Sequence, residues 1–440
     1  METSFLEEVR LTAFKSFKDA VLPLEELTLL VGRNDSGKSN ALDGLWALAR
    51  LAQGEDLRDA LDGGRDGPAV RGGAAGCAPF GDSAFSVGCT VRTGDRRVFL
   101  DVTVKVDRVV QVVAEHLRDE ERDLLVTEEP RGDSGDIDAR WSQSGTGMSR
   151  PLAFRATRLL SSQVLARIPA TTEGQRVHLA GAQVLAALRS VFVLDPVPSL
   201  MRQYVPRRDV VLHRDAVNLS AAVASLLEDP ATAERVRSVF ARLNEQEVVE
   251  VTTSRSDLDD VMLTLVERFA GHEQSVPARV MSDGSLRFLA ILVALLQAPP
   301  ALVLDAGRLD LAVLASEDAV GQTTLVIEEL ENGLHASQAQ LLIGLVREEV
   351  AHRRVRALAT AHSPALLDAL SGDEHRSVVV CQRDREGRST LHRLVDLPNY
   401  VDIVAAGGLG RSAEQDRLRR REGPTQTPSD ALDEIFRSAG

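Results

Sequence analysis

The chain has 440 residues, more than one ordinary compact core accommodates, so we expect two cores or one core with a large insertion. Hydrophobic residues make up 44% and charged residues 26%, which is typical of a globular chain and excludes extensive disorder. The net charge of -14 argues against general electrostatic attraction to DNA, although it leaves room for a local basic groove.

Cysteine usage and the N-terminal residues bear on the compartment. Cys77, Cys89 and Cys381 lie far apart and match neither a disulfide framework nor a zinc site, which suits a reducing compartment. The first residues include acidic side chains where a signal peptide carries positive charge, and no segment reaches the ~20 apolar residues of a membrane span. We therefore expect a cytoplasmic protein that does not insert into a membrane.

The N-terminal part has the pattern of an α/β unit. Strands are expected at residues 8–14 and 27–31, followed by a glycine-containing loop and a helix with apolar residues at helical spacing. Residues 53–82 are rich in Gly and Asp and indicate a loop or insertion, to which we assign no chemistry. Two further strand-like runs follow at 84–92 and 97–113.

The rest of the chain mixes helical and strand-like segments. Residues 152–244 are mostly helical, with a strand-like run at 191–194. A β-like pair follows at 248–253 and 260–267. The run 286–296 is a continuous apolar helix that should be buried. Two continuous apolar strands, typical of a parallel sheet, follow at 324–327 and 355–360. The α/β core therefore begins at the N-terminus and finishes near the C-terminus.

One motif between the second strand and its helix points to phosphate binding. The pattern GxxxxGK[ST] is matched in full by Gly32, Arg33, Asn34, Asp35, Ser36, Gly37, Lys38 and Ser39. Asn40 follows it directly. Its glycines let backbone N–H groups turn towards phosphates at the positive end of a helix. Lys38 would reach the β- and γ-phosphates of ATP, and Ser39 would ligate Mg²⁺. The alternative is a strand–helix turn with a chance lysine.

Two carboxylates end the apolar run 324–327. Glu328 would hold Mg²⁺ through water, and Glu329 would orient and polarise the attacking water. The alternative is a solvated acidic turn. Asp is usual at the first position, so the longer arm of Glu328 leaves its ligation open. A similar strand ends in Asp305, but no second acid follows it.

A second loop and a histidine extend the candidate site. The loop before the buried helix, about 45 residues before Glu329, contains Ser282, Asp283 and Gly284. It resembles the ABC signature loop, which binds the γ-phosphate of ATP in another subunit. The alternative is a commonplace turn. His362 follows the strand 355–360, where ABC ATPases place a histidine that contacts the γ-phosphate; the alternative is a capping or surface residue. His335 follows the acidic pair and has two equally supported roles. It could lie in a loop that crosses to a partner subunit, or it could belong to a helix N-terminus.

These segments together resemble the AAA_21 or RecF-like ATPases, relatives of the ATPase part of OLD-family proteins and, more distantly, of RecF and SMC heads. The resemblance covers residues 9–410 and rests on FKSFKD, GRNDSGKSN, NLSAAVASLL, MSDGSLRFLAIL, VIEELENGLH and TAHSPALLDAL, which begin at residues 14, 32, 218, 281, 326 and 360. It implies ATP and Mg²⁺ as cofactors, with Glu329, His362 and Lys38 as catalytic residues. It also implies a head-to-tail dimer formed on ATP.

The same resemblance implies the fold. It is an α/β fold of the ABC-type P-loop NTPase head, whose lobe I is a mixed sheet interrupted by an inserted, largely helical lobe II. We expect lobe I at residues 1–113 and 301–410, lobe II at 114–300 with the signature loop and helix at its end, and a tail at 411–440.

The biological role is open at this stage. Many OLD proteins continue into a Toprim nuclease domain, but only 78 residues follow His362, with scattered acids such as Asp384, Glu386 and Asp396, so we expect any nuclease on a separate chain. The leading hypothesis is an ATPase that regulates or senses for such an effector in bacterial anti-phage defence.

Three other roles compete with this hypothesis. One is a RecF-like DNA-binding repair clamp, with Arg202, Arg207 and Arg208 as groove candidates. Another is a transporter ATPase, which the departure of SDGS from the transporter signature disfavours. The last is an ATP-bound structural latch with little turnover.

Overall fold

The computed structural model describes residues 3–64, 69–130, 135–143, 147–243, 247–297, 321–352, 355–405, 408–415 and 417–418. Asp305 and residues 419–440 of the predicted tail 411–440 lie outside these ranges.

The centre of the molecule is a parallel sheet. Five strands pair in parallel, in the order β10 (Val191–Leu194), β15 (Thr323–Ile327), β16 (Val355–Ala361), β3 (Leu27–Val31) and β17 (Val378–Arg383). Neighbouring residues of β3 and β15 enter opposite cores, since Leu30 and Val326 pack on one face while Leu29 and Leu325 pack on the other. Burial on both faces explains the continuous apolar runs and confirms the predicted parallel strands.

Antiparallel strands extend this sheet from β17. In spatial order they are β18 (Ser389–Arg393), β2 (Phe17–Pro23), β1 (Ser4–Phe14), β4 (Ala84–Thr93), β5 (Arg96–Val106), β6 (Val110–Asp119), β7 (Asp123–Thr127), β8 (Asp136–Trp141) and β9 (Leu152–Arg155), although β18 meets β2 in parallel. Among the described residues the sheet has 14 strands. Residues 114–155 thus continue the sheet, and the prediction of a helical lobe beginning at residue 114 is wrong. The sequence pattern missed these strands because they carry exposed charged residues and have only a weak apolar alternation.

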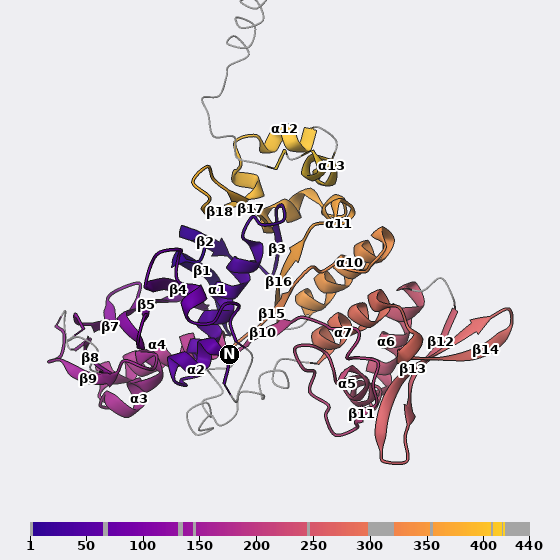
Figure 1. The fold of residues 1–440 in the computed structure, drawn as a ribbon, viewed down its shortest axis with the longest axis horizontal. Coiled ribbons are helices and arrows are strands. Elements are labelled where there is room, and N and C mark those ends of the chain that lie inside the picture. Colours follow the sequence, from indigo (N-terminus) through magenta and orange to yellow (C-terminus); the bar gives the residue numbers. More distant parts are fainter. Residues whose placement is uncertain are drawn as a thin grey trace, which may run out of the picture.

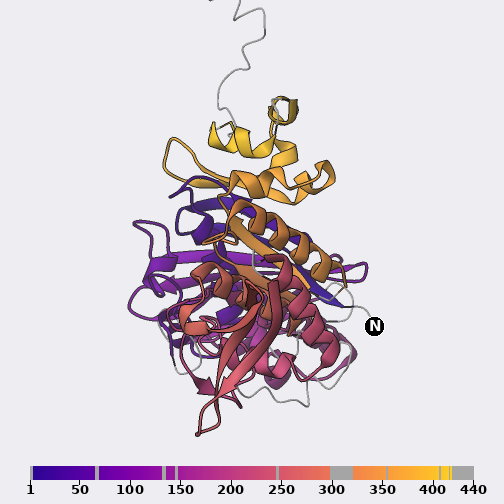
Figure 2. The same ribbon diagram turned by 90° about the vertical axis from the view of Figure 1, so that its right-hand side faces the viewer.

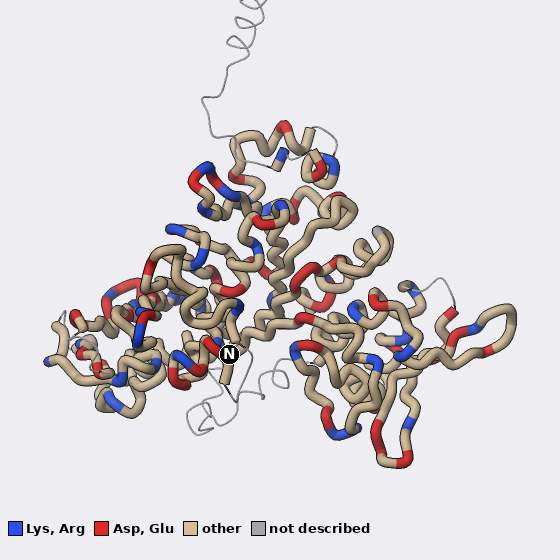
Figure 3. The backbone as a smooth tube through the Cα atoms, in the orientation of Figure 1, with Lys and Arg blue, Asp and Glu red and all other residues tan. Residues whose placement is uncertain are grey.

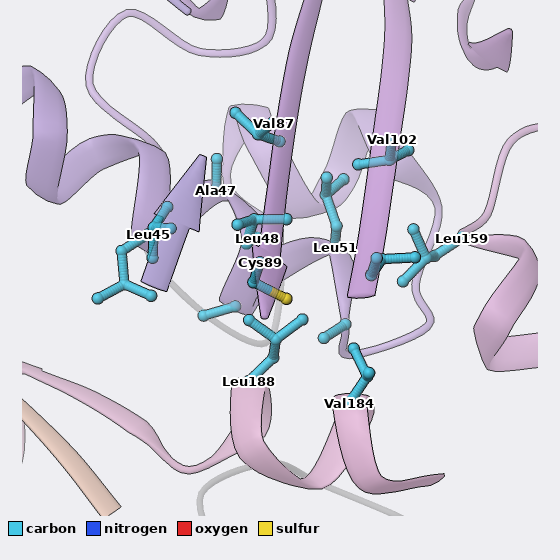
Figure 4. Packing of buried hydrophobic residues seen from close by; sticks show 14 of the residues in the cluster. Leu45, Ala47, Leu48, Leu51, Val87, Cys89, Val102, Leu159, Val184 and Leu188 are labelled. Carbon is cyan, nitrogen blue, oxygen red and sulfur yellow. The ribbon is translucent and has the colours of Figure 1, made fainter. Parts of the chain in front are cut away.

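Two helices cover the antiparallel face. These are α1 (Lys38–Leu51) and α4 (Thr172–Arg189), with shorter helices α2 (Leu57–Asp62) and α3 (Val164–Arg167) beside them. Figure 4 shows Leu48 and Leu51 of α1 and Leu188 of α4 meeting Val87 and Cys89 of β4 in one buried cluster. The helix that begins at the phosphate loop is therefore anchored along its length in the core.

The inserted lobe lies on the other side of the parallel strands (Figure 1). It contains α5 (Leu219–Leu226), α6 (Pro230–Leu243), α7 (Asp283–Leu296) and a small antiparallel sheet of β11 (Val205–Pro206), β12 (Glu247–Arg255), β13 (Asp260–Phe269) and β14 (His272–Pro277). Helix α7 is buried almost throughout, which confirms the predicted apolar helix, and it shares a core with β15 and α10 (Ala336–His352). The lobe is thus helical on its core side, with strands outside.

The C-terminal helices lie at the opposite end of the molecule from the β12–β13 hairpin (Figure 2). They are α11 (Pro364–Asp368), α12 (Tyr400–Ala405) and α13 (Leu409–Glu414). Helix α11 follows β16 directly, so this end of the sheet carries both the phosphate loop and the loop of His362.

Candidate functional site

The phosphate loop, residues 32–39, leaves the buried end of β3 and enters α1. Gly32 and Gly37 have φ values of 156° and 111°. A Cβ on Gly32 would lie 2.2 Å from the backbone oxygen of Cys381, and a Cβ on Gly37 would lie 2.2 Å from Ser389 Oγ. Conformation and space therefore both require glycine at these two positions.

Strand β18 and the β1–β2 turn support this loop from outside. Ser389 Oγ donates to the carbonyl of Ser36 at 2.7 Å. Asn40 donates from Nδ2 to Ser16 Oγ at 2.9 Å, and Ser16 Oγ lies 2.8 Å from Ser389 Oγ. The loop conformation is thus held by segments far away in the sequence.

Lys38 is buried and turned onto the loop that precedes it. Its Nζ donates to the carbonyls of Gly32 and Arg33, both at 2.8 Å. Burial lowers the pKa of Lys38, while the negative charges of Glu329 and Glu331 oppose this shift. The ammonium group therefore lies within electrostatic reach of the acids that follow β15.

The loop has the features that a triphosphate requires. A cavity of about 650 Å³ is lined by residues 31–36 and by His362, among others. The hydroxyl of Ser36 is buried and has no hydrogen-bond partner within the described part of the chain. Ser39 is exposed at the first turn of α1, where its oxygen is accessible to a cation. These residues fit Mg–ATP, with phosphates at the loop and Mg²⁺ at Ser39.

Glu329 adopts an unusual backbone conformation after β15. Its φ is 50°, in the left-handed region, which costs about 1 kcal/mol for a residue with a Cβ. Its backbone N–H donates to Thr360 Oγ1 at 2.8 Å, and Asn332 Nδ2 donates to Glu329 Oε2 at 2.8 Å. The exposed carboxylate is therefore directed by Asn332, a residue to which the sequence analysis assigns no role.

Glu328 is paired with an arginine that no sequence motif indicated. Arg71 donates from Nη2 and Nη1 to the two carboxylate oxygens of Glu328 at 2.7 and 3.1 Å. The same guanidinium reaches Asp43 Oδ1 at 2.8 Å and the carbonyl of Ser39 at 3.2 Å. Lys15 completes the cluster at Asp43 Oδ2, 2.6 Å away. Arg71 lies in the Gly- and Asp-rich stretch 53–82, where an isolated arginine gives no signal.

His362 is positioned through Glu331. The Glu331 Oε1 atom accepts hydrogen bonds from the backbone N–H groups of His362 and Ser363, which begin the loop into α11. Burial and the positive charge of Lys38 lower the pKa of His362, and Glu331 and Glu329 oppose them. The lowered pKa favours the neutral imidazole, which lies within electrostatic reach of the lysine of the phosphate loop.

The signature loop, residues 282–284, caps α7. Ser282 Oγ accepts from the backbone N–H of Ser285 at 3.0 Å. Arg202 binds this loop through Asp283 Oδ1 at 2.8 Å and the carbonyl of Met281 at 2.7 Å. A Cβ on Gly284 would lie 2.1 Å from the backbone oxygen of Gly333. The signature loop therefore packs directly on the loop that follows Glu329.

The structure brings the predicted residues together in two groups. Lys38, His362 and Glu329 interact electrostatically around the phosphate loop. The signature loop instead lies beside residues 331–335. His335 occupies the position before α10, where its N–H donates to Gln338 Oε1 at 2.9 Å, so its contacts are those of a helix N-terminus.

Two other kinds of site are absent from the described residues. In that part of the chain, no group of three or more His, Cys, Asp or Glu side chains is arranged to hold a metal ion. Within the same ranges, no helix has both the length and the apolar character needed to cross a bilayer.

Comparison with known proteins identifies the family. The profile of AAA_21, described as "AAA domain, putative AbiEii toxin, Type IV TA system", matches residues 27–368, and no curated protein matches the sequence. Solved structures similar to this chain include an SmcHead bound to the C-winged helix domain of ScpA, at 12% identity over 88% of this chain and 97% of that chain, with a TM-score of 0.45. The SMC head domain from Thermotoga maritima shows 13% identity over 88% and 98%, with a TM-score of 0.39. The Smc head domain from Pyrococcus furiosus with an extended coiled coil, bound to the C-terminal domain of ScpA, shows 13% identity over 92% and 99%, with a TM-score of 0.44. The chain belongs to the AAA_21 family, and its fold is α/β, with a large mixed sheet and an inserted lobe.

Proposed function

We propose that this protein is a cytoplasmic ATPase that binds and hydrolyses ATP, dimerises on ATP, and regulates or senses for a separately encoded effector in anti-phage defence. The observation that supports hydrolysis best is the carboxylate of Glu329, held by Asn332 within electrostatic reach of Lys38. A loop that only stored phosphate would not need a directed carboxylate beside its lysine.

Each residue of the site has a task in this proposal. Bound Mg–ATP supplies the γ-phosphoryl group and the divalent charge that stabilises its transfer. Lys38 leaves the loop carbonyls and neutralises the β- and γ-phosphates. Glu329 accepts a hydrogen bond from the attacking water and orients it. The neutral His362 donates a hydrogen bond to the γ-phosphate, with its loop fixed by Glu331.

The placement of the signature loop supports the proposed dimer. Gly284 and Gly333 contact each other within one chain, so the signature loop and the loop 331–335 form one surface. That surface would complete the phosphate site of a second copy through Ser282 and the N-terminus of α7. In this proposal the mixed sheet of lobe I binds the nucleotide, and the inserted lobe that ends in the signature loop and α7 meets the other copy.

The defence role is supported by the family description, which names a putative toxin of a type IV toxin–antitoxin system. The clamp alternative has less support, because Arg202 and Arg207 are engaged by Asp283 and Glu228, and because acidic and basic residues are interspersed along the backbone (Figure 3). Duplex DNA binding that weakens steeply with salt would revive that alternative.

Phosphate release tests the proposed activity. The wild type should hydrolyse ATP only with Mg²⁺, and Lys38→Ala should lose nucleotide binding. Glu329→Gln should bind ATP with turnover reduced at least a hundredfold, since water orientation is lost while the phosphate loop is intact. Lys18→Ala serves as the control because Lys18 is exposed outside the phosphate loop. Equal turnover in the wild type and Glu329→Gln would contradict the proposal.

A further inference from the structure

The contacts of Arg71 lie where the metal of the nucleotide would bind. We propose that Arg71 is an internal counter-ion that occupies Glu328 until Mg²⁺ displaces it, so that Arg71 sets the Mg²⁺ concentration at which the site takes up nucleotide. This inference rests on the ATP-binding function proposed above and concerns the regulation of the same site.

The guanidinium of Arg71 spans both residues assigned to Mg²⁺, Glu328 and Ser39, the latter through its carbonyl. Both carboxylate oxygens of Glu328 are engaged, at 2.7 and 3.1 Å, and the Glu328 side chain is only 19% exposed. A carboxylate in a fork-to-fork pair with arginine has lost its most favourable acceptor directions. Mg²⁺ or its bound water gains these acceptor directions of Glu328 when the pair opens.

An anchor at Asp43 keeps Arg71 in place. The Nε of Arg71 is bound to Asp43 Oδ1 at 2.8 Å, and the Asp43 side chain is 7% exposed. Lys15 Nζ donates to the backbone oxygen of Arg71 at 2.7 Å and to Asp43 Oδ2 at 2.6 Å. Opening the pair with Glu328 therefore leaves the arginine tethered through Asp43, ready to return when the metal leaves.

The local charge is balanced without a metal. Asp43 and Glu328 carry two negative charges, and Lys15 and Arg71 carry two positive charges. A divalent cation entering beside Ser39 adds charge to a balanced cluster unless Arg71 withdraws from Glu328. Removing the guanidinium leaves two carboxylates with one ammonium group, which strengthens the attraction for Mg²⁺.

The experiment is a Mg²⁺ titration of nucleotide binding, followed by the fluorescence of a labelled ATP analogue on the full chain. In Arg71→Gln the Mg²⁺ concentration at half-saturation should fall about tenfold, because a charge-assisted pair no longer competes with the metal. Arg58→Gln is the matched control, since Arg58 belongs to the same segment and its ion pair is with Asp62. The control should titrate like the wild type.

A second variant protects the test against misfolding. Arg71→Lys keeps the positive charge and loses the fork, so its half-saturation should lie between those of the wild type and Arg71→Gln. An unchanged or higher Mg²⁺ requirement in the folded variants would overturn the inference and assign Arg71 to phosphate binding or to structure. Failure of the wild type to bind nucleotide at any Mg²⁺ concentration would instead refute the proposed function.

Discussion

Replacing Gly284 with alanine should destabilise the protein through one backbone contact. The new Cβ would lie 2.1 Å from the oxygen of Gly333 and 3.0 Å from its carbonyl carbon, whereas ordinary contact begins at 3.4 Å. Both atoms belong to the main chain, so no side chain can rotate away. The signature loop and the loop 331–335 must separate by roughly 1 Å, and overpacking of this kind costs about 1–3 kcal/mol.

Equilibrium urea unfolding measures the effect, with Gly344→Ala as the matched control. Gly344 lies in α10, and a Cβ at this position would meet no atom within 4 Å, so alanine there should stabilise the helix by roughly 0.5–1 kcal/mol. The two substitutions are chemically identical and should shift the urea midpoint in opposite directions. A Gly284→Ala protein as stable as the wild type would refute the close packing of the two loops.

Two further predictions concern single carboxylates. Asn332→Ala should lower turnover about tenfold with little change in nucleotide affinity, because Glu329 loses the hydrogen-bond donor at 2.8 Å that directs its carboxylate. An unchanged turnover number in a phosphate-release assay would contradict this. Burial raises the pKa of Glu115 from 4.5 to about 7, although Ser161 and Leu160 donate to it. Since the folded-state pKa is the higher one, this contribution to stability is full below pH 4.5 and is lost as pH rises through 7. Between about pH 5 and pH 8 the free energy of unfolding should therefore fall by roughly 2.5 kcal/mol relative to Glu115→Gln, and parallel pH profiles would contradict the shift.

The parts of the site that the sequence predicts are contiguous. The phosphate loop combines eight successive residues with a strand before it and a helix after it, so local pattern alone locates it. The pair Glu328 and Glu329 is likewise tied to the end of a continuous apolar strand. The continuous apolar runs 324–327 and 355–360 indicate strands of a parallel sheet, and in the structure these two strands pair with each other.

The parts that escaped prediction depend on contacts between distant segments. Arg71 is separated from Glu328 by 257 positions and lies in a stretch without periodicity. The contact of Gly284 with Gly333 depends on how α7 packs against β15 and α10, which periodicity does not encode. Strands β7 and β8 are five and six residues long and carry several charged residues, so their pattern does not separate them from loops.

Two copies of this chain should together make a composite ATPase site, and this is the central claim. Light scattering on a sizing column measures the mass of the Glu329→Gln protein and so tests its dimerisation most directly, because this variant should bind ATP and retain it. Without nucleotide the mass should be that of one 47.6 kDa chain, and with Mg²⁺ and ATP it should double. Adding Ser282→Arg, which places a bulky side chain on the exposed signature loop, should restore the single-chain mass. A Glu329→Gln protein that binds ATP and keeps the mass of one chain would contradict the account.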